Sequence, residues 1–132
     1  MPNLLSATDS DAAARAFEIA VKHAFHSIMI TQAGTGAENQ RIVFVNQAFT
    51  DMTGYPADEV IGKTPRILQG ARTEQQVLGE LREKLASESD FHGRAINYRK
   101  DGSEFVIEWS VYPVRDPSGS VTHYVAVQHE VI

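Results

Sequence analysis

The sequence predicts an α+β domain, with a five-stranded antiparallel sheet, short helices on one face of it and a flanking helix at the N-terminus. Three features indicate this fold. Two short apolar strands come early in the chain, a group of helical segments occupies the middle, and three long strands joined by tight turns come last. The 132 residues, 42% of them hydrophobic, suffice for one buried core.

A helix over about 11–23 is expected after a polar leader. The leader ends in residues whose side chains commonly cap helices, namely Thr8, Asp9, Ser10 and Asp11. The apolar positions of the helix form only a thin stripe, made of Ala13, Phe17, Val21 and Ala24. Such a helix needs a surface to lie on, and the pattern leaves open whether that surface is its own domain or a second copy. We assign 1–24 to the leader and flanking helix, and 25–132 to the main domain.

Two short strands are expected next, over 25–31 and 41–45. The first contains a run of apolar residues, and the second is rich in β-branched residues. A loop opened by Gly34-Thr35-Gly36 and ending near Asn39 separates them. The two strands are therefore expected to pair as a hairpin with a loose connection.

Three helices are expected in the middle of the chain. Asn46 is a favourable N-cap for a helix that Gly54 ends, and a proline at a first-turn position indicates a short helix over 56–61. The run Thr73-Glu74-Gln75-Gln76 has the pattern of a capping box, so a third helix is expected from there to about Ala86. Its buried face would consist of Val77, Leu78, Leu81 and Leu85.

Three long strands are expected at the end, over about 93–99, 104–114 and 121–131. An Asp-Gly pair at Asp101 marks the first turn between them, and a Pro-Ser-Gly run after Asp116 marks the second. Consecutive strands joined by such short turns pair in antiparallel fashion. These three strands therefore make up most of the sheet.

Alternation along these strands sorts their side chains onto two faces. One face, here called the pocket face, holds Phe105, Ile107, Trp109, Val111, Tyr124, Ala126 and Gln128. The opposite face, here called the outer face, holds Val106, Glu108, Ser110, Tyr112, Val125, Val127 and His129. A lone glutamine among apolar residues needs hydrogen-bond partners if it is buried. The outer face is unusually apolar for a solvated surface, so a helix or a partner is expected to cover it.

Composition and patterning argue against several functions. The net charge of −5 and the lack of a basic run give no indication of nucleic-acid binding. No apolar stretch approaches a membrane span and the N-terminus is no signal peptide, so we expect a cytoplasmic protein that binds no membrane. The five histidines have no metal-ligand spacing, and no nucleophile–base pair is visible. We therefore expect neither a metal site nor an enzyme.

The stretch Gly62-Lys63-Thr64-Pro65-Arg66-Ile67-Leu68-Gln69-Gly70 is dense in groups that could hold a ligand. Arg66 offers a fork of donors suited to a phosphate, and the amide of Gln69 both donates and accepts. This stretch resembles the flavin-binding signature of light-oxygen-voltage domains within the PAS superfamily. The string Phe44-Val45-Asn46-Gln47-Ala48-Phe49 is also typical of PAS domains.

The resemblance covers about 25–131 and implies a PAS fold, a sensory role and a bound flavin, either FMN or, as a further possibility, FAD. It also implies individual roles. Arg66 and Arg82 match the arginines that bind the flavin phosphate, and Gln69 matches the glutamine that contacts the ribityl chain. Asn97 matches the first asparagine on the pyrimidine edge. Gln128 matches the glutamine near flavin N5 and O4, which passes the signal into the last strand.

The sequence departs from the family pattern at three positions. Pro65 stands where photoactive members have a reactive cysteine, and the chain contains no cysteine at all, so no thiol adduct can form. Thr64 replaces an asparagine, and Ile107 replaces the second asparagine on the pyrimidine edge. Similar cysteine-free domains occur in flavin-dependent redox sensors, so the stimulus is expected to be redox state, blue light or both.

Two kinds of partner are expected, the first from the apolar outer face and the second from the resemblance. We expect a homodimer formed through the helix at 11–23 and the outer face, and a downstream effector that receives the signal. An alternative reading is a ligand-free PAS module whose role is dimerisation and signal relay, with Ile107 and Trp109 filling the cavity.

Overall fold

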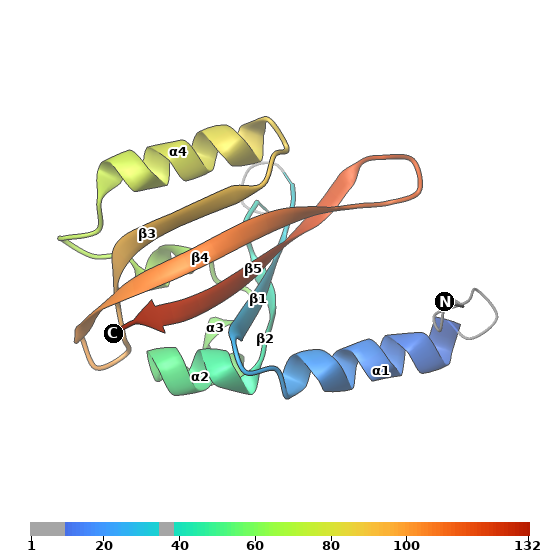
Figure 1. Cartoon of the computed structure of the whole chain (residues 1–132), viewed down its shortest axis with the longest axis horizontal. Helices are drawn as coiled ribbons and strands as arrows, with labels where there is room; N and C mark the ends of the chain where they lie inside the picture. The colour runs from blue at the N-terminus through green and yellow to red at the C-terminus, as the bar shows by residue number, and fades with distance from the viewer. Residues whose placement is uncertain (1–9, 35–38) are drawn as a thin grey trace.

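The computed structural model describes residues 10–34 and 39–132 and confirms the five-stranded antiparallel sheet (Figure 1). The strands lie in the order β2-β1-β5-β4-β3, and every neighbouring pair is antiparallel. Their bounds are Ser27–Gln32 for β1, Ile42–Val45 for β2, Phe91–Tyr98 for β3, Glu104–Arg115 for β4 and Val121–Val131 for β5. The first and last strands of the chain are therefore neighbours at the centre of the sheet.

The helices cover the pocket face of this sheet. Their bounds are Gln47–Thr53 for α2, Ala57–Val60 for α3, Pro65–Leu68 for the 3₁₀ helix η3 and Gln75–Ala86 for α4. Phe49, Val60 and Leu68, one from each of the first three, belong to the same buried cluster as the pocket-face residues of β4. Leu78 of α4 is buried as well. The core thus lies between one face of the sheet and this layer of short helices.

Strand alternation sorts the side chains as the sequence predicts. Every pocket-face residue of β4 and β5 named above is buried, and their outer-face neighbours are half-buried or exposed. Ile107, with 1% of its surface exposed, is among the most buried large side chains in the described part of the chain. This arrangement brings Gln128 of β5 into the core.

Asn46 connects three elements near the start of the fold. Its side-chain oxygen accepts from the backbone of Phe49, which caps α2 as predicted, and also from the backbone of Ile28. Its amide nitrogen donates to the carbonyls of Val21 and His26, at 2.9 and 3.0 Å. Because this residue is buried, it fixes where the chain turns from helix α1 (Ser10–Lys22) into β1.

Helix α1 extends away from the sheet (Figure 1). Phe17 and Ile19 are 55% and 61% exposed, so most of the apolar surface of α1 does not pack on the described part of its own domain. The candidate caps Thr8 and Asp9 precede the described residues. Among residues 10–34 and 39–132, no helix is long and apolar enough to cross a membrane.

The predicted capping box at Thr73 is wrong. Helix α4 begins after Glu74, and no side chain caps it. The Thr73 hydroxyl instead accepts from the backbone of Gly70 and donates to the carbonyl of Ile96 in β3, while Glu74 accepts from the backbone of Ile96. Thr73 and Glu74 thus connect the start of α4 to β3. The Thr73 side chain does not cap the helix because it bonds to these tertiary partners instead.

Several element boundaries also differ from the expectation. Phe25 is 92% exposed and precedes β1, which runs from Ser27 to Gln32. Strand β3 begins at Phe91, two residues earlier than expected, because Phe91 pairs with Val111 of β4. The short helix expected over 56–61 is only Ala57–Val60. The predicted loop residues Thr35 and Gly36 lie outside the described residues.

Candidate functional site

Two adjacent hollows lie between the pocket face and the helices. The one here called the inner chamber has a volume of about 60 Å³ and lies beneath η3 and α4, against Ile107, Trp109 and Gln128. The one here called the outer groove has a volume of about 880 Å³ and runs outward between η3, α4 and the segment around Gln40. Gln69 lines both. The two hollows share lining residues and are therefore adjacent.

All of the site residues predicted from the sequence lie on these two hollows. Those on the outer groove are Thr64, Arg66, Gln69 and Arg82. Those on the inner chamber are Gln69, Asn97, Ile107 and Gln128. They come from η3 and the residues that flank it, and from α4, β3, β4 and β5, so segments distant in sequence meet at one place.

The geometry of η3 explains how one short stretch serves both hollows. Pro65 begins this helix, at a position where its missing N–H costs nothing. Because a 3₁₀ helix has three residues per turn, consecutive side chains point in different directions. Arg66 is exposed, Leu68 is buried in the core, and Gln69 is half-buried where the groove meets the chamber.

The outer groove carries positive charge in a protein whose net charge is −5. Arg41, Arg66 and Arg82 line it, and Glu88 is the only acidic side chain among its described lining residues. Arg41 donates to the carbonyl of Gly62 at 2.7 Å. The side chains of Arg66 and Arg82 make no hydrogen bond or ion pair within 10–34 and 39–132. The groove therefore suits an anionic group.

The inner chamber is lined by amide groups with few protein partners. Gln128, 3% exposed, accepts through Oε1 from the Ser27 hydroxyl at 2.9 Å. Within the described segments, neither its Nε2 nor the side-chain amides of Asn97 and Gln69 have a hydrogen-bond partner. No fully buried side-chain polar atom of those segments lacks a partner, so these amides open onto the hollow rather than being sealed in protein. Buried amides require partners, so the chamber is built for a polar ligand or for water.

Sequence reasoning missed several residues of the site, among them Arg41 on the outer groove, Thr31 on the inner chamber and Gln40 on both. Thr31 is buried on β1 and lines the inner chamber. Alternation along β1 could have identified it, since Thr31 shares a face with the buried Met29. Gln40 lines both hollows and has a left-handed backbone with φ of 67°. No sequence signal marks that position, because glutamine rarely adopts this conformation.

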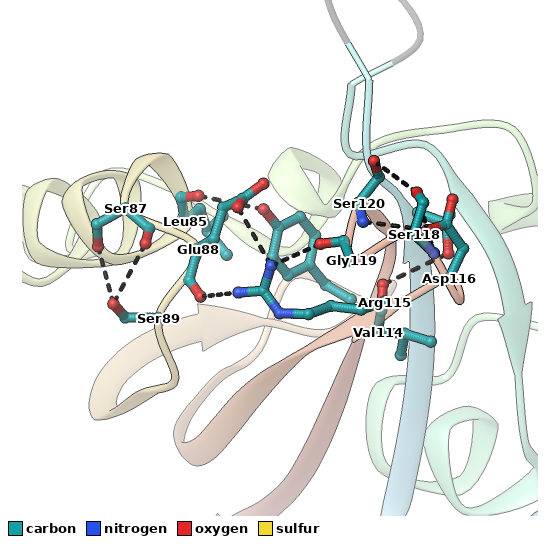
Figure 2. Close-up of polar contacts among 12 residues, drawn as sticks. Leu85, Ser87, Glu88, Ser89, Val114, Arg115, Asp116, Ser118, Gly119 and Ser120 are labelled. Carbon is teal, nitrogen blue, oxygen red and sulfur yellow. Dashed lines mark hydrogen bonds and ion pairs between the residues drawn. The ribbon is translucent and has the colours of Figure 1, made fainter.

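The α4 wall of the groove is anchored at its C-terminal end (Figure 2). Arg115, at the end of β4, donates to the carbonyl and carboxylate of Glu88 and to the carbonyl of Gly119. Tyr124 donates its hydroxyl to the carbonyl of Leu85 at 3.1 Å. Burial, with the Glu88 carboxylate nearby, raises the pKa of Tyr124, so the hydroxyl keeps its proton. The position of α4 is thereby fixed relative to β4 and β5.

On the outer face, charged groups pair with one another. The Glu108 carboxylate lies 3.0 Å from Arg94, 3.1 Å from His129 and 3.5 Å from His92. The hydrogen bond from Arg94, together with the positive charges nearby, lowers the pKa of Glu108. No group of histidine, aspartate and glutamate side chains in the described parts of the chain is arranged to hold a metal ion.

The two hollows fit a flavin unequally. The outer groove lies within the range of about 300–1,000 Å³ that is typical of small-molecule pockets, and its arginines suit a phosphate. The inner chamber presents amides to a polar ring edge, but its volume of about 60 Å³ is below the ~300 Å³ at the lower end of that range. The donor set therefore fits a flavin, whereas the chamber must widen before it could accept the ring system.

Comparison with known proteins places these features in a family. A model of the PAS domain matches residues 27–131. The blue-light-activated histidine kinase 1 of Erythrobacter litoralis is 38% identical over 90 residues, which cover 68% of this chain and 25% of that protein. The chain spans about 10% of the length of the first curated relatives that it matches.

Two solved structures share the fold. One, reported as "Flavin Analogue Sheds Light on Light-Oxygen-Voltage Domain Mechanism", has a TM-score of 0.79 and 30% identity, and the match covers 95% of this chain and 88% of that one. The other is an RNA-binding light-oxygen-voltage receptor, with a TM-score of 0.86 and 27% identity, covering 99% of this chain and 36% of that one. The chain therefore belongs to the PAS domain family, and its relatives include light-oxygen-voltage domains.

Proposed function

We propose that this PAS domain is a sensor that binds one flavin non-covalently, as FMN or, given the open groove, as FAD. The observation that carries the proposal is that two unlike donor sets line two adjacent hollows. Arg66 and Arg82, whose side chains have no partner within 10–34 and 39–132, line the outer groove. The NH₂ groups of Gln69, Asn97 and Gln128, which have no partner within the same residues, line the inner chamber. A flavin nucleotide has the matching polarity, with phosphate at one end and a ring with a polar edge at the other.

Each donor set has a distinct role in this proposal. Arg66 and Arg82 hold the phosphate, and each charge-assisted contact contributes about 1.5–3 kcal/mol. Gln69, at the junction of the two hollows, bonds the ribityl chain, and Thr64 lies beside it. Asn97 bonds the polar ring edge. Ile107 offers no hydrogen bond there, so that edge has fewer partners than in the family pattern.

Gln128 is the residue that passes on the state of the ligand. A bound flavin supplies a ring nitrogen, N5, that accepts a hydrogen bond when oxidised and donates one when reduced. Gln128 presents its NH₂ group to the first state and its carbonyl to the second, so its amide must rotate. Rotation removes the acceptor from Ser27, whose hydroxyl is also buried. Both residues lie in paired central strands, since Ser27 faces Gln128 across β1 and β5.

The signal then leaves through β5 to an effector. The chain covers only part of each longer relative, so an effector outside these 132 residues receives the change. No covalent adduct takes part, since no cysteine is present. The stimulus is redox state, blue light or both. We assign no catalytic turnover to this domain and expect it in the cytoplasm.

A direct binding measurement tests the proposal. The protein is refolded with an excess of FMN, in parallel with FAD, and unbound flavin is removed by dialysis. We expect one flavin per chain, with a visible flavin absorption band that stays with the protein. Protein that remains colourless after refolding with either flavin would contradict the proposal.

A second candidate function, a ligand-free module for dimerisation and relay, is favoured by the small volume of the inner chamber. Both candidates include a homodimer formed through α1 and the outer face, because Phe17, Ile19 and Tyr112 are exposed there. We expect Phe17→Glu with Ile19→Glu to convert the protein to a monomer in sedimentation experiments. A native chain that already sediments as a monomer would exclude the dimer.

Binding of nucleic acid or membrane is not part of the proposal. One structural neighbour is an RNA-binding receptor, and this chain matches about a third of it. Here the net charge is −5, and the positive charge of the groove lies at the candidate ligand site. Repulsion by the remaining acidic surface opposes binding to a polyanion.

A further inference from the structure

Trp109 is the only tryptophan in the chain and lines the inner chamber. It lies on β4 with 9% of its surface exposed, directly opposite Gln128 of β5 on one side and Gly93 of β3 on the other. Residues that face each other in this way have their Cβ atoms about 4.5–5.5 Å apart. The indole is therefore a direct neighbour of the amide to which we assign the signalling role.

The indole is supported from the β3 side. The ring of Phe91 packs against it with ring centroids 5.1 Å apart. Gly93 makes room for that ring, because a Cβ at this position would lie 2.6 Å from Cζ of Phe91. Phe91 and Gly93 thus hold the indole on the chamber side of the sheet. An aromatic side chain of this kind buries about 150–250 Å² of surface, and the chamber that it lines has a volume of only about 60 Å³.

We propose that Trp109 acts as a plug that limits the size of ligand the inner chamber accepts. With the indole in place, the chamber holds a few water molecules, and a fused-ring ligand enters only after the indole has moved. The apparent association constant is then the intrinsic association constant multiplied by the fraction of molecules whose indole is displaced, so a small fraction weakens binding. The choice of a flavin as this ligand rests on the function proposed above, whereas the plug itself rests on the position of the indole.

The main test replaces the plug by a smaller apolar residue. We expect Trp109→Leu to bind FMN about tenfold or more tightly than the native chain, as measured by flavin fluorescence at equilibrium. Phe105→Leu is the matched control, because Phe105 is a buried aromatic residue on the same face of the same strand but does not line the chamber. The control variant should bind FMN as the native chain does.

A second measurement needs no substitution. If the indole must move first, the observed rate of FMN binding to the native chain levels off as the FMN concentration rises. Without a plug the rate increases linearly over the same range. This readout remains informative if Trp109→Leu fails to fold, because a linear rate would exclude the conformational step that the plug requires.

The outcomes separate the plug from the proposed function. Tighter binding by Trp109→Leu with a saturating native rate supports both. Binding by Trp109→Leu alone supports the plug and overturns flavin binding by the native chain. Equal affinities with a linear native rate overturn the plug and leave flavin binding intact. If neither the native chain nor folded Trp109→Leu binds FMN, both are overturned.

Discussion

The two faces of the sheet differ in whether their polar side chains have protein partners. On the outer face the Glu108 carboxylate is paired with Arg94, His92 and His129. On the pocket side, the Gln128 Nε2 and the Asn97 amide have no partner in residues 10–34 and 39–132, although both residues lie in paired strands. These groups open onto the inner chamber rather than being sealed in protein, so a ligand or water can bond them. The difference indicates that the pocket side is complete only with a ligand or water, whereas the outer face satisfies its own charges.

The largest effect should come from removing the charges where the pocket opens. We expect Arg66→Ala with Arg82→Ala to weaken FMN binding by on the order of 10²–10⁴-fold, because two charge-assisted contacts of about 1.5–3 kcal/mol each are lost. Riboflavin, which lacks the phosphate, should bind the variant and the native chain equally. A loss of the same size for both ligands in titrations would show that the arginines act through the fold.

The next effect concerns the polar residue in the centre of the pocket face. We expect Gln128→Leu to lower the free energy of unfolding by about 1–3 kcal/mol, because the buried Ser27 hydroxyl loses its acceptor. FMN should still bind, but the difference in hydrogen exchange of residues 121–132 between oxidised and reduced protein should vanish. His129→Leu, the adjacent outer-face position, is the control and should keep that difference. If Gln128→Leu also keeps the difference in hydrogen exchange, the signal does not pass through Gln128.

A further amide placed in the pocket would test whether polar groups on this face depend on a ligand. Ile107 is 1% exposed, so Ile107→Asn without a ligand should destabilise the fold by about 1–3 kcal/mol. FMN should recover part of this loss by bonding the new amide, and thus raise the melting temperature of the variant more than that of the native chain. An equal rise in both proteins would place the polar ring edge away from Ile107.

The smallest effect is expected on the outer face. The pKa of Glu108 in the folded protein lies below its ordinary value of 4.5. Its pairing therefore stabilises the fold above about pH 4.5, and this stabilisation disappears as the pH falls through the lower folded pKa. Glu108→Gln should melt slightly below the native chain at pH 6, and this gap should close towards pH 3 without any change in FMN affinity. A gap that widens in acid would contradict the sign of the pKa shift.

Much of the fold follows from local sequence signals. Alternation assigned the faces of β4 and β5 correctly, and Asn46 and Gly54 bound α2 as expected. Thr73 was misread because its hydroxyl bonds to β3, a contact that no local pattern encodes. Such errors arise where a side chain can bond either to a neighbour in sequence or to a residue distant in sequence.

The sequence predicted which residues would gather at the candidate site, and their binding roles stay a prediction, whereas the shape of the site did not follow from the sequence. The resemblance to light-oxygen-voltage domains placed Arg66, Gln69 and Gln128 on one site, and the structure brings them to adjacent hollows. The volume of the inner chamber depends on how Trp109 and the leucines of α4 pack, which composition and periodicity do not determine. Gln40 was missed because its left-handed backbone depends on the surrounding loop.

The side-chain amide signals of the protein test the central claim most directly. In ¹H–¹⁵N spectra of the native chain, FMN should shift the NH₂ signals of Gln128, Asn97 and Gln69, because these NH₂ groups have no partner in the part of the chain that the structure describes. Gln47 is the internal control, since its NH₂ group donates to Asp51 on the exposed side of α2, and its signal should stay in place. If saturating FMN leaves the signals of Gln128 and Asn97 unmoved, the pocket-side amides are not the flavin's partners and the account is wrong.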